Sequence, residues 1–354
     1  MLKTVTVSAS KTYNILIGEG ILDCADTAIR ASAGGQSAMI VTDDNVAALY
    51  ETRLSNILKK NGYRAVRFVI PHGESSKNES NFIAILNSLA EEKFTREDVV
   101  IALGGGVVGD LAGFAAACYM RGIHFVQIPT TLLAAVDSSV GGKTAINLNA
   151  GKNLAGMFFQ PDLVICDISL LSTMPAEVYI DGCSEVIKYG VISDPALLRS
   201  LETPVNKQFL DIITQCVLIK RDIVAEDEFE KGARKLLNFG HTVGHAIELL
   251  SGYQISHGQA VAIGMAVESR AAYRMGFCQK ECTDDILRML RLYNLPENTG
   301  FDSEKLAQAC LADKKRGGGN LTMIFPTEIG KCIMKEIPIC EMEGLISCGL
   351  SERV

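Results

Sequence analysis

Residues 99–110, VVIALGGGVVGD, decide the fold class of this chain. An apolar run leads into three glycines and then into a second apolar segment, which predicts a buried strand, a tight turn and a helix. Gly104, Gly106 and Gly109 match the G-x-G-x-x-G spacing, in which glycines let phosphate oxygens reach backbone amides at a helix N-terminus. A tight structural turn is the alternative. The match departs from the usual dinucleotide fingerprint because it follows the third strand of the alternating unit, not the first.

Short apolar runs alternate with helical patterns on both sides of this stretch. Further strands are predicted over residues 38–42, 65–70, 124–128 and 163–166. Helices are predicted over residues 45–61, 78–93, 107–120 and 130–136. The alternation predicts a mainly parallel sheet with helices on both faces, and residues 4–7 and 13–17 are expected to add a small strand pair.

The pattern changes beyond residues 173–175, where the strand signals fade. Residues 177–291 are almost wholly helical, and a short strand pair is predicted near residues 321–325 and 331–336. We therefore predict an α/β, Rossmann-like nucleotide-binding domain at residues 1–172 and a mainly α-helical domain at residues 173–354. Ligand sites are common between domains, so we expect the active site in the interdomain cleft.

Composition narrows the function classes. A length of 354 residues favours two domains, and the net charge of −7 argues against a general nucleic-acid binder. The N-terminus lacks the apolar run of a signal peptide, and the most apolar stretch, residues 99–120, carries five glycines and is expected to be buried rather than to span a membrane. Eleven cysteines without a CxxC pair predict free thiols in a reducing cytoplasm.

Three of the five histidines lie within LLNFGHTVGHAIELLSGYQISHG, residues 236–258. The first two belong to a polar stripe with spacings of four, three and four residues on an otherwise apolar segment. The stripe consists of Arg234, Asn238, His241 and His245. On a single helix these side chains would span an arc of about 60°, which predicts one wall of a site. Gly240 and Gly244 weaken a helix and indicate that another part of the chain approaches closely.

Glu185 lies in a mostly apolar helical segment, with Lys188 one turn further on. A structural ion pair between the two explains this spacing. The alternative is a metal site in which a carboxylate and two imidazoles leave room for substrate oxygens, as catalytic zinc requires. Spacing alone does not decide which two of His241, His245 and His257 would be ligands.

Two further segments carry polar groups at expected strand ends. Residues 42–45, TDDN, could hold ribose or adenine, and helix capping explains them equally well. Gly142-Lys143-Thr144 resembles the end of a P-loop, but Asp137 stands where that motif requires its first glycine, so the P-loop interpretation fails. What remains is a polar, glycine-flanked loop. Its lysine could converge on an anion with Arg121 and Lys152, although solvated surface charges are the commoner outcome.

Together, several motifs resemble the 3-dehydroquinate synthase family of sugar-phosphate cyclases, over most of the chain from Asp43 to Lys331. The motifs are GGGVVGDLAGF, RGIHFVQIPTTLLAAVDSSVGGKTAIN, GKNLAGMF, SEVIKYG, LNFGHTVGHAIE, HGQAVAIGM and DKK. The resemblance implies a cytoplasmic, homodimeric lyase of aromatic amino acid biosynthesis that uses NAD and Zn²⁺, or Co²⁺ in its place. It implies conversion of the anionic sugar phosphate 3-deoxy-D-arabino-heptulosonate 7-phosphate to 3-dehydroquinate and phosphate. The implied steps are transient oxidation, phosphate elimination, reduction and aldol closure.

The resemblance also implies a role for individual residues. The implied metal ligands are Glu185, His241 and His257. The implied NAD-binding residues are Asp43, Asn45, Glu74, Lys77, Gly105, Gly106, Val107, Asp110, Thr130 and Thr131, with Lys143 and Lys152 beside them. The implied phosphate-binding residues are Arg121, Lys143, Asn153, His245 and Lys314. The implied carbohydrate-binding residues are Asp137, Lys152, Lys188, Lys220, Arg234 and Asn238.

Three rival interpretations remain. A metal-dependent polyol dehydrogenase would release NADH and would need no phosphate clamp, whereas this chain has candidate clamp residues at Arg121, Lys143, Asn153 and Lys314. Another sugar-phosphate cyclase would be expected to differ in the Ser-Val-Gly-Gly-Lys loop and in Gly-Lys-Asn, both of which are intact. An inactive nucleotide-binding or scaffold protein would be expected to lose a metal ligand, and none of the three is missing.

Overall fold

The computed structural model describes residues 1–314 and 319–350, without the side chains of residues 312–314. Its contacts divide the chain into two compact units. The first comprises Met1–Pro175 and Ile213–Phe229, and the second comprises Ala176–Ile212 and Glu230–Val354. The sequence predicts a single boundary after residue 172. The structure differs because the chain returns to the first unit within helix α8 (Phe209–Glu226).

Seven strands form the sheet of the first unit, in the order β1-β2-β9-β6-β5-β3-β4. Their bounds are β1 (Leu2–Ser8), β2 (Thr12–Gly18), β3 (Ser37–Asp43), β4 (Arg64–Ile70), β5 (Val99–Gly104), β6 (His124–Pro129) and β9 (Leu163–Asp167). β1 pairs antiparallel with β2, and the other neighbours are parallel. The predicted parallel sheet and the predicted N-terminal strand pair are confirmed. After β4 the chain crosses to β5 on the other side of β3, so the strand order reverses there.

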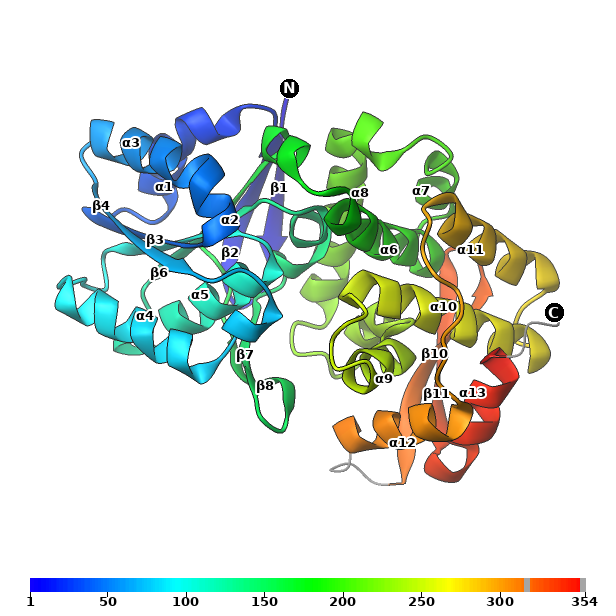
Figure 1. Ribbon diagram of the computed structural model, residues 1–354. Helices are drawn as coiled ribbons and strands as arrows, with labels where there is room; N and C mark the ends of the chain where they lie inside the picture. Colours follow the sequence, from blue (N-terminus) through cyan, green and yellow to red (C-terminus); the bar gives the residue numbers. More distant parts are fainter. Residues whose placement is uncertain (315–318, 351–354) are drawn as a thin grey trace. The chain divides into compact units, whose positions relative to one another are not determined.

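Helices cover both faces of this sheet (Figure 1). Helices α1 (Ala25–Ser32) and α3 (Thr52–Lys60) pack on one face, and α4 (Glu79–Glu91) and α5 (Gly106–Cys118) pack on the other. The alternation within β3 explains this, because Ala38 and Ile40 belong to the first core and Met39 and Val41 to the second. Two short helical turns, α2 (Asp44–Val46) and the π-helical η2 (Ala47–Glu51), precede α3.

A β-hairpin follows β6 where the sequence analysis expects a polar loop, so that expectation is wrong. Its strands are β7 (Lys143–Leu148) and β8 (Gly151–Phe158). Thr144 and Ile146 are buried in β7 while Lys143 is exposed, as in a strand with one covered face. A Cβ on Gly156 would lie 2.2 Å from the carbonyl oxygen of Thr144, so the two strands meet where only glycine fits. Before the hairpin, the predicted helix over residues 130–136 is a short turn that ends in a π-helical segment, η5 (Ala134–Ser138).

The second unit is mainly helical, as predicted. Its helices are α6 (Ala176–Ile192), α7 (Pro195–Ser200), the start of α8, α9 (His241–Leu250), α10 (His257–Arg274), α11 (Lys280–Leu292), α12 (Ser303–Lys314) and α13 (Met342–Leu350). The predicted strand pair is present as β10 (Asn320–Glu328) and β11 (Lys331–Pro338). Helix α10 is buried along most of its length and packs against α6, α9, α11 and α13.

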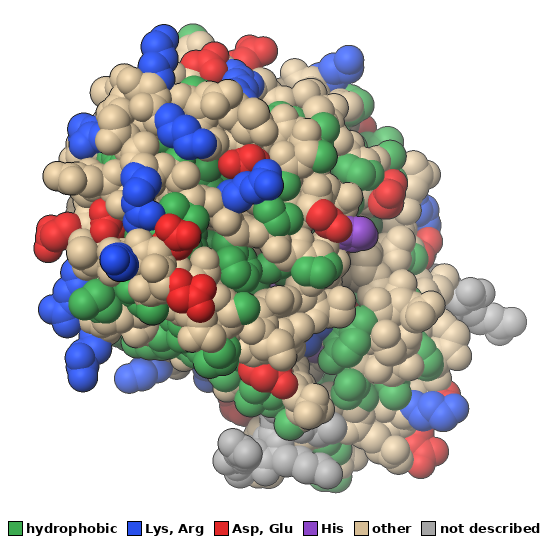
Figure 2. Space-filling view, turned by 60° about the vertical axis from the view of Figure 1, so that its left-hand side comes forward, with side chains coloured by type: hydrophobic (Ala, Val, Ile, Leu, Met, Phe, Trp, Pro, Cys, Tyr) green, Lys and Arg blue, Asp and Glu red, His purple; other side chains and the backbone are tan. Residues whose placement is uncertain are grey.

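The face of the molecule drawn in Figure 2 shows no continuous patch of one charge. Lys and Arg side chains are interspersed there with Asp and Glu, with hydrophobic side chains between them.

Among the described residues, no helix is both long enough and apolar enough to cross a membrane. The apolar stretch 99–120 forms β5 and α5 and lies in the core, as the sequence predicts.

Candidate metal centre and nucleotide-binding edge

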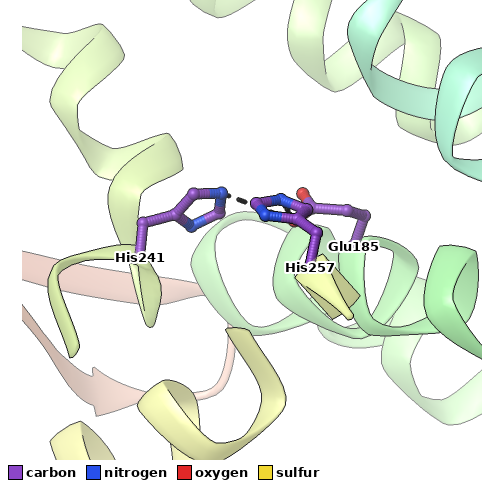
Figure 3. Close-up of side chains that lie close together, drawn as sticks. All are labelled: Glu185, His241 and His257. Atoms are coloured by element: carbon purple, nitrogen blue, oxygen red, sulfur yellow. Dashed lines mark ion pairs between the residues drawn. The ribbon is translucent and has the colours of Figure 1, made fainter. Parts of the chain in front are cut away.

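Three side chains of the second unit point toward one another from separate helices (Figure 3). Glu185 lies in the middle of α6, His241 is the first residue of α9, and His257 is the first residue of α10. The Nε2 atoms of His241 and His257 lie 3.5 and 3.7 Å from the same carboxylate oxygen of Glu185. One carboxylate and two imidazoles form the donor set of many catalytic zinc sites, which keep a further position open.

The segment that carries His241 is not the single helix that the polar stripe predicts. A 3₁₀ turn, η8 (Ala233–Asn238), ends before Phe239, and α9 begins at His241. Gly240 between them has φ 81°, a left-handed conformation that favours glycine. Its N–H donates to Glu268 Oε2 of α10 at 2.7 Å. A Cβ on Gly264 would lie 1.9 Å from the Gly240 carbonyl oxygen, which confirms the predicted close approach to this backbone.

Both histidines of this group have a hydrogen-bond acceptor near the ring nitrogen that faces away from Glu185. His241 Nδ1 lies 3.2 Å from the carbonyl oxygen of Phe239, and His257 Nδ1 lies 3.4 Å from Glu248 Oε2. A proton on each Nδ1 would make these hydrogen bonds and would leave each Nε2 lone pair for a metal ion. Such second partners hold the rings of metal-ligating histidines in place.

His245 was the third candidate ligand. Its ring centre lies 5.4 Å from that of His241 and 6.1 Å from that of His257. His245, Glu248 and His257 form a second group whose donor atoms could hold an ion. In the group with Glu185, the Nε2 atoms of His241 and His257 face the carboxylate, and Glu248 is left to accept a hydrogen bond from His257.

The electrostatics of the centre are those of a buried carboxylate among cations. Glu185 is 0% exposed and forms an ion pair with Lys188, which is 1% exposed, so the ion pair expected from the spacing is present. Burial and the charge of Lys188 hold the pKa of His241 well below its ordinary value. Burial also lowers the pKa of His257, but hydrogen bonds to Glu185 and Glu248 outweigh it and raise that pKa to about 10. The same carboxylates would favour a bound dication.

In the first unit, several of the predicted NAD-binding residues lie at the carboxyl ends of β3, β5 and β6. Asp43 ends β3, Gly105 and Gly106 follow β5 and begin α5, and Thr130 follows β6. This edge includes the point where the strand order reverses, which is where open α/β sheets bind ligands. The hydroxyl oxygen of Thr130 is buried and has no hydrogen-bond partner among the described residues.

At the start of α5, the backbone is open to the approach of a phosphate group. Gly105 is the N-cap of α5, and a Cβ there would lie 3.1 Å from Thr131 Cγ2. The side chain of Asp43 accepts a hydrogen bond from the N–H of Val46 at 2.9 Å, so the helix-capping explanation of this residue is confirmed. Burial raises the pKa of its carboxyl group. Backbone hydrogen bonds from Val46 and Asn45 oppose that shift.

A network joins the predicted nucleotide-binding residues to the hairpin. Lys77 Nζ donates to Asp110 Oδ2 and to Asn153 Oδ1, both at 2.5 Å. Glu74 accepts a hydrogen bond from Asn147 Nδ2 at 2.7 Å and lies 3.8 Å from Lys152 Nζ. Burial raises the pKa of Asp110, and Lys77 opposes that shift. Asn153 has φ 56°, and the N–H of this residue donates to Asn147 Oδ1 at 3.0 Å.

Lys220 and Asp137 are also brought together. Lys220, on the part of α8 that belongs to the first unit, donates to Asp137 Oδ1 at 2.9 Å and to the carbonyl oxygen of Asp137 at 2.6 Å. The lysine side chain is buried. The two oxygens of Asp137 compensate the burial of this charge, which would be costly without a partner.

The three cations expected to converge on an anion lie in two places. Lys152 belongs to the Glu74 and Lys77 network near the turn of the hairpin. Lys143 starts β7 and pairs with Phe158 at the other end of the hairpin, and it is exposed. Arg121, also exposed, lies between α5 and β6 with φ 66°. The backbones of the two lysines therefore lie toward opposite ends of the hairpin.

The remaining predicted residues belong to the second unit. Arg234, on η8, is 1% exposed. Asn238 donates to Glu230 Oε1 at 2.6 Å and lines a cavity of about 450 Å³ together with Lys235 and residues of β10. Lys314 is the last residue of α12, and its side chain lies outside the described residues.

Comparison with known proteins identifies the family. Residues 67–181 match the 3-dehydroquinate synthase N-terminal model, and residues 182–316 match the 3-dehydroquinate synthase C-terminal model. The chain belongs to the 3-dehydroquinate synthase family. It is 41% identical to the 3-dehydroquinate synthase of Enterococcus faecalis (strain OG1RF) over 351 residues, covering 97% of this chain and 98% of that protein. It is 40% identical to that of Shewanella frigidimarina, covering 96% and 97%.

Solved structures of sugar-phosphate cyclases share the fold. A 2-deoxy-scyllo-inosose synthase complexed with carbaglucose-6-phosphate, NAD⁺ and Co²⁺ is 26% identical, with a TM-score of 0.88 and coverage of 98% of this chain and 99% of that chain. A 2-epi-5-epi-valiolone synthase from Streptomyces hygroscopicus with NAD⁺ and Zn²⁺ bound is 26% identical, with a TM-score of 0.87 and coverage of 97% and 98%. An iron-containing alcohol dehydrogenase, 15% identical with a TM-score of 0.67 and full coverage of both chains, shares the fold alone.

Two residues of this family member support the site although the sequence analysis did not name them. Glu248 holds His257, and Asn147 joins Glu74 to Asn153. A signal for Glu248 was present, because a carboxylate in the apolar helix 241–250 needs a partner. Asn147 gives no such signal, because it lies in β7, within the stretch that the sequence analysis expects to be a polar loop, where Asn is common.

Proposed function

We propose that this chain is a 3-dehydroquinate synthase, an NAD- and metal-dependent lyase that converts 3-deoxy-D-arabino-heptulosonate 7-phosphate to 3-dehydroquinate and phosphate. Family membership over nearly the whole chain supports this activity. The observation that carries it is the convergence of His241 Nε2 and His257 Nε2 on one carboxylate oxygen of Glu185. This activity places the chain in aromatic amino acid biosynthesis.

Glu185, His241 and His257 would hold Zn²⁺ or Co²⁺. The donor set fits, because each Nε2 faces the carboxylate and each Nδ1 has its own acceptor. NAD would be held at the carboxyl edge of the sheet, where the glycine N-cap of α5 and the free hydroxyl of Thr130 support such a role. The NAD-binding residues would be Asp43, Asn45, Glu74, Lys77, Gly105, Gly106, Val107, Asp110, Thr130 and Thr131, with Lys143 and Lys152 beside them.

The remaining site residues would bind the sugar phosphate. Arg121, Lys143, Asn153, His245 and Lys314 would hold the phosphate. Asp137, Lys152, Lys188, Lys220, Arg234 and Asn238 would hold the carbohydrate. The buried pair Lys188–Glu185 and the pair of buried Lys220 with half-buried Asp137 support this second group, because each holds a cation beside a carboxylate.

A metal ion held by Glu185, His241 and His257 would supply Lewis-acid polarisation of a substrate hydroxyl, and a bound nicotinamide would supply reversible hydride acceptance. The chain itself supplies charge and orientation. Cations around the phosphate stabilise the negative charge that develops as phosphate leaves. Lys188 and Lys220 are fixed by their carboxylates, so they would hold the carbohydrate hydroxyls in the conformer that closes the ring.

Release of inorganic phosphate from the heptulosonate phosphate tests this function. We expect release to require both NAD and a divalent metal ion, with no net NADH at the end, because the hydride returns to the product. Stoichiometric NADH would instead identify a dehydrogenase. Phosphate release from a hexose phosphate, but not from the heptulosonate phosphate, would identify another sugar-phosphate cyclase.

We also propose that the enzyme works as a homodimer in the cytoplasm and binds neither nucleic acid nor membranes. The net charge of −7 supports the absence of nucleic-acid binding. Light scattering of the purified protein measures the subunit number, and a monomer mass would exclude the dimer.

A further inference from the structure

A carboxylate outside the ligand set joins the helix of Glu185 to the helix of His257. Asp181 lies on α6 one turn before Glu185, so both side chains lie on the same side of that helix. Its Oδ1 accepts hydrogen bonds from Ser256 Oγ and from the N–H of Gln259, the latter at 3.2 Å. The N–H of Gly258 also donates to this carboxylate. The three donors surround His257 in the sequence.

Asp181 accepts the hydrogen bonds from the first turn of α10 that an N-cap side chain of α10 usually accepts. Ser256 occupies the N-cap position of α10, and serine side chains commonly accept a hydrogen bond from the first turn there. Here the Ser256 side chain makes no such bond within α10 and instead donates to Asp181. The first N–H groups of α10 are therefore satisfied from α6.

The two helices also meet too closely at this point to allow a side chain. A Cβ on Gly258 would lie 2.2 Å from the Asp181 carbonyl oxygen and 2.6 Å from Asp181 Oδ1. Gly258 directly follows His257. The contact therefore sets the distance between α6 and the first turn of α10, and His257 is the first residue of that turn.

We propose that Asp181 is a positioning residue for the metal centre, which sets His257 at the distance from Glu185 that a shared metal ion requires. It acts through the start of α10 and does not touch the ion. Its negative charge at the N-terminus of α10 adds to the attraction for a cation. This inference rests on the proposed function, since it requires that Glu185, His241 and His257 bind a metal.

A purely structural cap would have a different consequence, and the same unit contains one for comparison. Asp194 is the N-cap of α7 and accepts hydrogen bonds from the N–H groups of Ala196 and Leu197 at 2.8 and 3.1 Å. Asp194 makes the same kind of contact on a helix that carries no metal ligand. Its substitution should lower the melting temperature without changing the affinity for metal.

The experiment compares Asp181→Ala and Asp181→Asn with Asp194→Ala and Asp194→Asn in the full-length enzyme. Co²⁺ is titrated into each metal-free protein, the visible absorption of the bound ion gives affinity and geometry, and thermal melts of the same samples report folding. We expect Asp181→Ala to bind Co²⁺ about 10- to 100-fold more weakly, with altered absorption bands, and Asp181→Asn to lose a smaller factor because Asn also caps helices. The Asp194 variants should match the wild type in Co²⁺ affinity.

Co²⁺ affinity within about twofold of the wild type in Asp181→Ala would overturn the inference. If Asp181→Ala does not fold, the same result in Asp181→Asn would overturn it. A wild-type protein that binds no Co²⁺ would contradict the proposed function instead, so the two failures are distinguishable.

Discussion

Replacing Glu248 by Gln tests how far the metal affinity of the centre depends on the carboxylate that contacts His257. The Glu248 carboxylate is buried, and its Oε2 lies 3.4 Å from His257 Nδ1. Gln keeps the size and one acceptor oxygen but removes the charge that favours a cation at His257. Partners of this kind typically contribute about 10- to 100-fold to metal affinity, which corresponds to about 1.4–2.8 kcal/mol. Because 3.4 Å is long for a hydrogen bond, we expect a loss near the lower end, about tenfold.

The assay is competition for Zn²⁺ or Co²⁺ between the protein and a chromophoric chelator, with Glu281→Gln on the exposed side of α11 as the matched control. The control should retain wild-type affinity. Two results would refute the reasoning. Unchanged affinity in Glu248→Gln would mean that Glu248 does not orient His257, and complete loss of metal would mean that Glu248 is itself a ligand.

Four further results are expected. Gly264→Ala should cost about 1–3 kcal/mol or more in stability, because its Cβ would overlap the Gly240 carbonyl oxygen; chemical denaturation with no change from wild type would contradict this. Lys77→Met should weaken NAD binding and lower the melting temperature, because it leaves Asp110 buried without its cation; calorimetry showing unchanged NAD affinity would exclude a role at that edge. At Asp98, hydrogen bonds outweigh burial and hold the pKa below its ordinary value, so its stabilisation is present above about pH 4 and is lost as the pH falls through the folded pKa. Asp98→Asn should therefore cost about 1–3 kcal/mol at pH 7 and less at pH 3, and an equal cost at both would disprove the assignment. Removing metal with a chelator should abolish phosphate release and lower the melting temperature, with both restored by Zn²⁺; activity that survives chelation would argue against a metal-dependent step.

The sheet could be predicted from the sequence because its signal is local. Strands β3 and β5 have continuous apolar runs and β6 has one interrupted only by Gln127, as expected for buried parallel strands, and each is followed by a helical pattern. The hairpin β7–β8 was missed because its strands are rich in glycine and polar residues and mostly exposed in β8. Its glycines and lysines invited comparison with phosphate-binding loops, whereas Gly156 is needed for strand contact.

The sequence could indicate which residues belong to the candidate site, but not how the backbone places them relative to one another. The polar stripe places His241 beside His245, as the structure does. The break at Gly240 depends on Glu268 and Gly264, which lie on a helix further along the chain. Likewise, the contact between Lys220 and Asp137 depends on the return of α8 to the first unit. Periodicity within one segment cannot reveal contacts that another segment imposes.

The burial of α10 has a consequence for how a captured ion would leave. The helix begins with His257, supports Gly240 through Glu268 and is packed on four sides by other helices. The His257 side chain at the start of the helix is 31% exposed, so a chelator can reach an ion at this residue while the buried remainder of α10 keeps its place. The rate at which a strong chelator strips the ion would then report how fast the ligands release it, and the fold would stay intact, because the strongly packed part of the helix opens far less often than exposed groups do.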